Sequence, residues 1–306
     1  MTTESSMVVG RYAPSPTGDL HVGNLRTALL AWLSAHHQGG ILRLRIDDLD
    51  PRTSSMGDEQ RQRSDLGQLG VTFDRGEIRQ SERSEHYDAA IANLVDRGMV
   101  YPCYCSRREI REAASAPHQH LPDGAYPGTC AGLGEQERRA RELDRPAALR
   151  VRASNIEIEV HDRRYGSRTE LVDDFVIRRN DGVPSYNLAT VIDDHAQGVT
   201  EVVRGADLLA GTARHIWLRD VLGLPQVQHE HVPLVVNSNG ERLAKRDGAV
   251  TLEDLAAQGF SADAVRGLIA ETLDLASRGE QPTMLELLER YDPDAIPTAE
   301  SVWDVH

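Results

Sequence analysis

The first residues that could bind a ligand or take part in a reaction form a short loop, Pro14-Ser-Pro-Thr-Gly18, followed by His21 and Gly23. Proline and glycine exclude a helix here, whereas the apolar spacing from Asn24 onward predicts one. Amide groups at the start of a helix attract phosphate, an imidazole can donate to a phosphate oxygen, and glycine lets the backbone approach closely. The pattern indicates a nucleotide site, although a plain turn with a surface histidine is the alternative.

A second such group surrounds the single lysine of the chain, Lys245, in the segment Arg242-Leu-Ala-Lys245-Arg246. Asn239-Gly240 marks a turn just before it. An ammonium group is a compact charge that meets one phosphate oxygen where the broad guanidinium does not fit. A lysine on such a loop could close over a phosphate chain and stabilise the charge that develops there. A solitary surface lysine is the alternative.

Three cysteines, Cys103, Cys105 and Cys130, lie close together in the sequence. An odd, clustered set argues against a disulfide framework and favours either a local metal site or three reduced thiols. Three thiolates and one further ligand would give the four-coordinate geometry of a structural zinc ion. His118 and His120 lie in the same segment and are candidates for the fourth position.

The elements expected to position these residues alternate between strands and helices. Met7 to Tyr12 and Ile41 to Ile46 are typical of buried strands, and a helix is expected between them, from Gly23 or Asn24 through Leu33. This order predicts a βαβ unit, and hence an α/β fold with a parallel sheet whose ligands bind where strands end. The alternation resumes from Pro184 to about Asn237.

Residues 101–145 interrupt this alternation with the cysteines, four prolines and a charged helix expected over Glu135 to Leu143. Short alternating runs between Ala147 and Ile177 predict antiparallel strands. Further helices are expected over Leu252 to Ala257, Ala262 to Leu273 and Met284 to Leu288. The predicted division is a first half of the core (1–100), an insertion (101–145), the rest of the insertion with the second half of the core (146–240), and the Lys245 loop with short helices (241–306).

The net charge of −14 argues weakly against a nucleic-acid partner, but the charge is unevenly distributed. Residues 251–306 carry 12 acidic and 3 basic side chains, so a basic surface elsewhere stays open. No apolar run approaches the length of a membrane span, and Met1 to Met7 lack the pattern of a secretory signal. We therefore expect a cytoplasmic protein without membrane contact.

Together the two phosphate loops resemble those of a known enzyme family. Arg11-Tyr-Ala-Pro-Ser-Pro-Thr-Gly18, with His21, Gly23 and Asn24, resembles the "HIGH" segment of glutamyl-tRNA synthetases, and the Lys245 segment resembles their "KMSKS" loop. The resemblance runs from about Met7 to Glu253. It implies the Rossmann-like parallel-sheet core of class I aminoacyl-tRNA synthetases, ATP with Mg²⁺ bound by His21, Gly23, Asn24 and Lys245, and catalytic roles for His21, Gly23 and Lys245.

The resemblance also implies glutamate as the amino acid. Family members hold it with residues that correspond here to Arg11, Tyr12, Ala13, Pro14, Ser15, Asp47, Tyr186 and Arg204. A guanidinium that binds a carboxylate in a water-poor pocket rejects the amide analogue. A surface arginine and a core tyrosine are the alternatives for Arg204 and Tyr186. Asp47 departs from the family's glutamate by one methylene, so a shift or a water is needed to reach the substrate ammonium.

About 50 residues follow the Lys245 loop, too few for the anticodon-binding domain of glutamyl-tRNA synthetases. With Cys103, Cys105, Tyr126 and Cys130, this resembles the glutamyl-queuosine tRNA(Asp) synthetases, which transfer activated glutamate to the modified wobble base queuosine. The resemblance implies one structural zinc ion on those four residues. It also implies L-glutamate, ATP and the tRNA(Asp) anticodon stem-loop as partners, and we expect a monomer.

Two alternatives stay open. A truncated glutamyl-tRNA synthetase that charges tRNA(Glu) would share both loops. A non-catalytic paralogue could bind amino acid or tRNA as a regulator, but the presence of His21, Gly23 and Lys245 argues against it.

Overall fold

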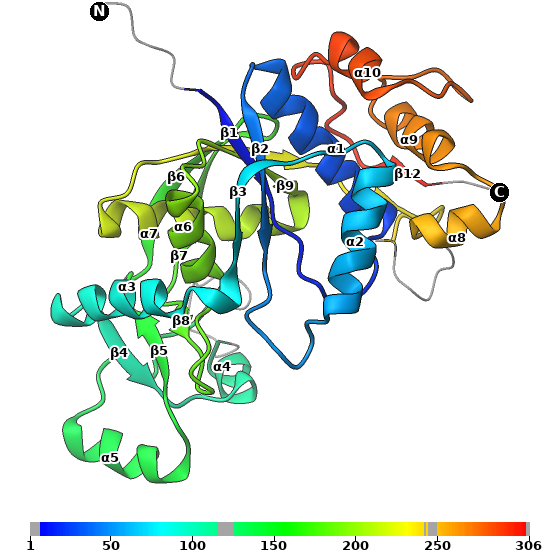
Figure 1. Ribbon diagram of the computed structural model, residues 1–306. Coiled ribbons are helices and arrows are strands. Elements are labelled where there is room, and N and C mark those ends of the chain that lie inside the picture. The colour runs from blue at the N-terminus through cyan, green and yellow to red at the C-terminus, as the bar shows by residue number, and fades with distance from the viewer. Residues whose placement is uncertain (1–6, 115–124, 242, 244–249, 304–306) are drawn as a thin grey trace, which may run out of the picture.

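The computed structural model describes residues 7–114, 125–241, 243 and 250–303 (Figure 1). Its core is a parallel sheet of the expected kind. Strands β1 (Val9–Tyr12), β2 (Ile41–Ile46) and β3 (Asp74–Arg79) pair in parallel, with α1 (Val22–His37) and α2 (Met56–Gln68) as the connections between them. The prediction of an α/β fold opened by a βαβ unit is therefore confirmed.

The second half of the core adds a further parallel group. Strand β10 (Gln228–Val232) pairs in parallel with β9 (Glu201–Gly205), and α7 (Thr212–Leu222) connects them. This group lies beside β1, where the Thr200 amide donates to the Val9 carbonyl at 2.9 Å. The carboxyl ends of β1, β2 and β9 therefore lie at one edge, which is where parallel sheets bind their ligands.

Helix α1 fixes the geometry of this edge. Its apolar side chains, among them Leu25, Leu29 and Leu33, are buried in the main core. The turn after the helix contains Gly40, where a Cβ atom would lie 2.3 Å from the Val8 carbonyl oxygen. Only glycine permits this approach, which brings the chain back beside β1 to begin β2.

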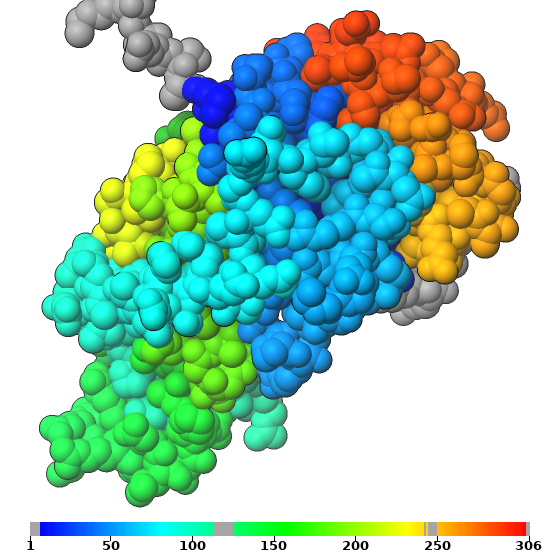
Figure 2. All heavy atoms as spheres, in the orientation of Figure 1, coloured from blue at the N-terminus to red at the C-terminus, as the bar shows by residue number. Residues whose placement is uncertain are grey.

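The insertion forms its own small antiparallel sheet. Strand β5 (Ala148–Val151) lies between β4 (Val100–Cys103) and β8 (Val176–Arg178), and two helices flank it, α4 (Arg107–Ala114) and α5 (Glu135–Asp144). Figures 1 and 2 show α5 on a lobe that projects from the rest of the molecule. Further elements connect it to the core: η1 (Gln80–Glu82), α3 (Ser84–Asp96) and α6 (Tyr186–Ala196). Within the core, η2 (Ala206–Gly211) follows β9 and leads into α7.

The antiparallel strands predicted between Ala147 and Ile177 are present, and one of them has a second neighbour that was not predicted. Strands β6 (Ile156–Asp162) and β7 (Gly166–Val172) form the expected antiparallel hairpin. However, β6 also pairs in parallel with β10, through Asp162 and His229, and so joins the core sheet. Strand alternation reports only which face is buried, and it is the same for a parallel and an antiparallel neighbour.

The acidic C-terminal region packs on the core. It holds α8 (Leu252–Ala257), α9 (Ala262–Glu271), α10 (Met284–Arg290) and β12 (Ser301–Val302), which pairs in parallel with β11 (Val235–Val236). Buried Arg26 of α1 donates to the carbonyls of Pro233 at 2.6 Å and Thr272 at 3.2 Å. The expected helices are present, and α9 ends two residues before the predicted Leu273.

The division into four segments stays a prediction. Within the described ranges, no helix combines the length and the apolar character that crossing a membrane would require.

Candidate active site

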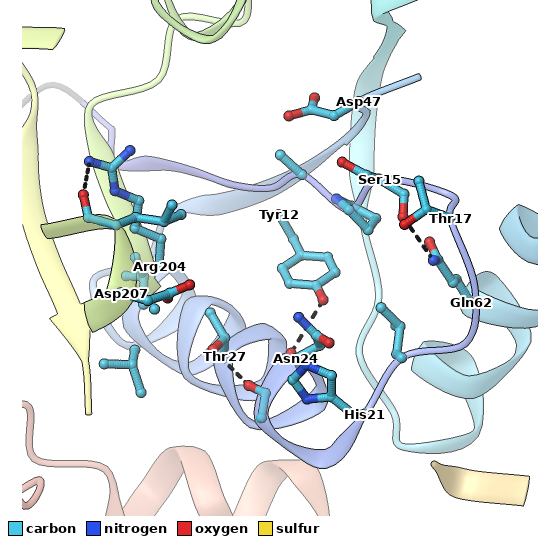
Figure 3. A pocket seen from close by; sticks show the side chains of 18 of the residues that line it. Tyr12, Ser15, Thr17, His21, Asn24, Thr27, Asp47, Gln62, Arg204 and Asp207 are labelled. Atoms are coloured by element: carbon cyan, nitrogen blue, oxygen red, sulfur yellow. Dashed lines mark hydrogen bonds between the residues drawn. The ribbon is translucent and has the colours of Figure 1, made fainter. Parts of the chain in front are cut away.

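A cavity of about 520 Å³ opens at the carboxyl ends of β1, β2 and β9. Eleven of the twelve residues predicted to bind ATP or glutamate line it: Arg11, Tyr12, Ala13, Pro14, Ser15, His21, Gly23, Asn24, Asp47, Tyr186 and Arg204. The twelfth, Lys245, lies outside the described residues, as do His118 and His120. Figure 3 shows Arg204 on one side of the cavity, His21 and Asn24 at the start of α1, and Asp47 and Ser15 on the other side. Their roles as ligands stay predictions.

The start of α1 offers a surface suited to phosphate. His21 is the residue before the helix, and the first turn carries no acidic side chain. The positive end of the helix dipole is therefore not neutralised by its own first turn. At Gly23, a Cβ atom would lie 3.2 Å from both Cε1 and Nδ1 of His21. Glycine at this position thus leaves the imidazole room as well as exposing the backbone.

The loop that precedes α1 is held by Gln62, a residue that the sequence analysis did not single out. Its side-chain amide donates to the carbonyls of Ser15 at 3.0 Å and Gly18 at 2.7 Å. Gln62 is buried on α2, so the helix positions the loop from behind. A glutamine on a polar helix has no distinctive local pattern, and only the tertiary contact reveals it.

Arg204 is the cation most suited to a substrate carboxylate. It is only 4% exposed, yet its hydrogen bonds among the described residues all go to neutral acceptors. One of them is the Tyr186 hydroxyl, 3.3 Å from Nη1, and Tyr186 is 42% exposed at the cavity. A buried guanidinium without a paired carboxylate favours binding of an anionic ligand.

Arg11 is less available, since the protein already engages it. Its Nη1 donates to the Val203 carbonyl at 3.0 Å, and its Nε lies 3.4 Å from Oδ1 of Asp194. Burial lowers the pKa of Arg11, and Asp194 opposes that shift. Arg11 therefore contributes charge to the cavity wall while its side chain braces β1 against β9.

Asp47 is bound by a neighbour on its own strand end. Arg45 Nε lies 2.6 Å from Oδ1 of Asp47, and Arg45 Nη2 lies 3.3 Å from Oδ2. Burial raises the pKa of the Asp47 carboxyl, although the charge of Arg45 acts in the opposite direction. The carboxylate of this shorter side chain is therefore already paired within the protein.

The three cysteines meet at one point in the insertion. Their sulfur atoms lie within 4.8 Å of one another, with 3.5 Å between Cys105 and Cys130. The Tyr126 hydroxyl is 3.3 Å from Cys103 Sγ and 3.7 Å from Cys105 Sγ, and it accepts a hydrogen bond from the Cys130 amide at 2.8 Å. Zinc–sulfur bonds of ~2.3 Å in a tetrahedron separate sulfurs by ~3.8 Å. These four side chains therefore fit one small metal ion.

A larger cleft of about 1430 Å³ joins this cluster to the cavity, with Ser15, Thr17, Asp47 and Tyr186 in both linings. Seven arginines line the cleft: Arg52, Arg107, Arg111, Arg145, Arg150, Arg179 and Arg214. The lining also holds three aspartates, Asp47, Asp50 and Asp173. Beside it, Asp181 pairs with Arg52 and Arg179, and Glu109 pairs with Arg145, so seven arginines face five acidic groups. This surface is positively charged on a chain whose net charge is −14. Such a local reversal favours a polyanionic partner.

Comparison with known proteins identifies the family of this chain. The model of the family "tRNA synthetases class I (E and Q), catalytic domain" matches residues 7–280. A glutamyl-Q tRNA(Asp) synthetase of Nocardia farcinica is 51% identical over 289 residues, 94% of this chain and 90% of the relative. One from Symbiobacterium thermophilum is 44% identical over 304 residues, 95% and 94% of the two chains.

Solved structures of glutamate-tRNA synthetases have the same fold as this chain. A glutamate tRNA ligase from Elizabethkingia meningosepticum, in complex with its amino acid, superposes with a TM-score of 0.83 at 26% identity, over 98% of this chain and 67% of that one. The glutamate-tRNA synthetase of Elizabethkingia anophelis has the same TM-score at 27% identity, over 98% and 68%. The chain therefore belongs to the class I glutamyl- and glutaminyl-tRNA synthetase family, within the group of glutamyl-Q tRNA(Asp) synthetases.

Proposed function

We propose that this enzyme uses ATP to activate L-glutamate as glutamyl-adenylate and transfers the glutamyl group to queuosine in the anticodon of tRNA(Asp). The observation that carries the choice of amino acid is Arg204, buried at the cavity and bonded to neutral acceptors. Its charge would pair with the side-chain carboxylate of glutamate, and glutamine would leave that charge unpaired in a buried site. The relatives named above support the choice of acceptor.

In the first step, an oxygen of the glutamate α-carboxylate attacks the α-phosphorus of ATP. A new O–P bond forms as the bond to pyrophosphate breaks, so no nucleophilic side chain is required. His21, the backbone at the start of α1 and Lys245 would stabilise the charge on the phosphates. Mg²⁺ bound with ATP would neutralise part of the same charge.

In the second step, a hydroxyl of queuosine attacks the carbonyl carbon of the mixed anhydride, loses its proton and displaces AMP. We assign the arginine-lined cleft as the path of the anticodon stem-loop. The cleft leads directly into the cavity, and its arginines can bind phosphates without reading bases. Selection of tRNA(Asp) would then depend on the modified base that fits beside the adenylate.

We further propose that Cys103, Cys105, Tyr126 and Cys130 hold one zinc ion with a structural role. A full set of four protein ligands leaves no open position for a substrate. The ion would fix the floor of the cleft, which Cys103, Cys105 and Tyr126 line. A monomer in the cytoplasm stays part of this proposal.

The direct test is transfer of labelled glutamate to tRNA(Asp) with and without queuosine. We expect labelling only of the modified tRNA, and ATP–pyrophosphate exchange with glutamate in the absence of tRNA. Labelling of tRNA(Glu) instead would identify a truncated glutamyl-tRNA synthetase. Absence of glutamate-dependent exchange, with a folded protein, would favour a non-catalytic paralogue.

A further inference from the structure

We infer that Asp162 and His231 act as positioning residues for glutamate specificity, because they orient Arg204 through a neutral imidazole and leave its charge available to the substrate. This inference rests on the proposed use of glutamate. The three residues lie in a row across neighbouring strands. His231 of β10 is directly opposite Arg204 of β9, and Asp162 ends β6 on the other side of β10.

The hydrogen bonds fix which nitrogen of His231 carries the proton. Oδ2 of Asp162 accepts from the His231 backbone amide at 3.1 Å and lies 2.6 Å from Nδ1. A carboxylate only accepts, so Nδ1 carries the hydrogen and Nε2 presents its lone pair. That lone pair accepts from Arg204 Nε at 2.9 Å. Both the Asp162 and the His231 side chains are fully buried, so water does not compete for these bonds.

A second histidine, His215, contacts another nitrogen of the Arg204 guanidinium, Nη1. Nε2 of His215 lies 3.1 Å from Oδ1 of Asn187, and its Nδ1 lies 3.3 Å from Nη1 of Arg204. If Nε2–H donates to Asn187, Nδ1 is the acceptor for Arg204. Thr212 Oγ1 accepts from Nη2 at 2.9 Å. The protein side of the guanidinium is thus held at three points by uncharged atoms.

Both histidines are neutral at neutral pH. Burial lowers the pKa of His215, and the charge of Arg204 lowers it further. Burial also lowers the pKa of His231, while its hydrogen bond to Asp162 acts in the opposite direction. Two neutral acceptors position Arg204 without cancelling its charge. Arg45, in the same site, differs from Arg204 because its charge is balanced within the protein. Asp47 and Asp194 both form ion pairs with it.

Two further bonds of Arg204 lie on its cavity side. These go to the Tyr186 hydroxyl at 3.3 Å and the Leu208 carbonyl at 3.2 Å, and both residues are more than a third exposed. A substrate carboxylate can replace these two exposed contacts with a bidentate pair while the buried contacts stay in place. A carboxylate at the position of His231 would instead satisfy Arg204 within the protein and reduce the preference for glutamate over glutamine.

The variants that test this are His231→Leu, which removes the acceptor, and His231→Gln, whose Oε1 can take the place of Nε2. Glutamate-dependent pyrophosphate exchange of His231→Leu should show a KM for glutamate about 10- to 100-fold higher, from the lost bond to a charged group, and a reduced preference for glutamate over glutamine. The KM for ATP should not change, and His231→Gln should recover most of the loss. His36→Gln, at a partly buried histidine in the last turn of α1, is the matched control and should resemble the wild type.

An unchanged KM for glutamate in folded His231→Leu, or equal defects in His231→Leu and His231→Gln, would overturn the inference. A wild type that does not activate glutamate would instead overturn the proposed function. One measurement needs no variant to fold: ¹⁵N spectra of labelled histidine should show the Nδ1–H tautomer for His231. The Nε2–H tautomer would contradict the arrangement whatever the enzyme's substrate.

Discussion

Arg45 binds the carboxylate of Asp47, with Nε 2.6 Å from Oδ1, at the edge of the cavity where the substrate ammonium is expected. The resemblance described above implies a glutamate at this position, one methylene longer than Asp47. We expect that longer side chain to carry its carboxylate past Arg45 toward the ligand, with the same charge.

Asp47→Glu should therefore lower the KM for glutamate about two- to fivefold, the effect of ~0.5–1 kcal/mol expected for one additional hydrogen-bonded contact to the substrate ammonium. The added methylene carries the carboxylate toward the cavity, while Arg45 keeps Asp194 as a partner. Pyrophosphate exchange at varied glutamate concentrations measures this KM. Asp47→Asn, with similar shape and no charge, is the control and should raise the KM. A higher KM in Asp47→Glu would mean that the pair with Arg45 is itself what the site requires.

Gly23→Ala should lower kcat for adenylate formation about tenfold, since ~1.4 kcal/mol of lost transition-state stabilisation gives that factor. The new Cβ would lie 3.2 Å from the His21 ring and displace it. Stopped-flow or exchange kinetics would show the effect in kcat, with little change in the KM for glutamate.

Gly67→Ala is the matched control, because α2 has open space around a Cβ at that position. It should leave the exchange rate unchanged and stabilise the fold by ~0.5–1 kcal/mol, as expected for alanine in a helix. Equal kcat values for Gly23→Ala and wild type would remove His21 from the catalytic assignment.

The sequence predicted the parts of this site that lie close together along the chain. Gly18 and His21 lie between β1 and α1, Gly23 lies in the first turn of α1, and both elements have the apolar patterns that predicted them. The contacts that organise the site are distant, however. Gln62 reaches Ser15 across 47 residues and His231 reaches Asp162 across 69, and neither has a local signature. The membership of β6 in the core sheet was missed for the same reason, since alternation does not specify the partner strand.

Lys245→Ala should reduce glutamate-dependent pyrophosphate exchange by roughly 10²-fold or more, as for other lost transition-state contacts of several kcal/mol. Lys245→Arg is the more specific test, because it keeps the positive charge and changes only its shape. Of the 34 lysine and arginine residues in the chain, 33 are arginine. If a compact ammonium is required, arginine should restore little activity. Exchange close to the wild-type rate in Lys245→Ala would defeat the assignment of this loop to ATP.

Removal of the proposed zinc should loosen the insertion more than it slows activation. Cys130→Ala is expected to bind less than one zinc ion per chain and to lower Tm by roughly 5–10 °C, as a loss of about 3 kcal/mol would. Glutamate-dependent exchange should be largely retained, since the cysteines lie outside the cavity lining. Metal analysis and thermal unfolding, with the wild type before and after chelation, check this. A full zinc content in Cys130→Ala would exclude that ligand set.

The cleft arginines should matter for RNA and not for activation. Arg107 and Arg111 are exposed on α4 and line the cleft. Changing both to glutamine should weaken transfer to tRNA about tenfold and make the salt dependence shallower by about two in log–log slope, one for each lost phosphate contact. Pyrophosphate exchange without tRNA should be unchanged.

Arg139→Gln is the matched control for that double variant. Arg139 is an exposed arginine of the same insertion, ion-paired with Glu135 on α5 and absent from the cleft lining. It should leave both transfer and its salt dependence at wild-type values, because removing a charge outside the path costs no phosphate contact. Equal losses in the two variants would assign the effect to overall charge and move the RNA path away from this cleft.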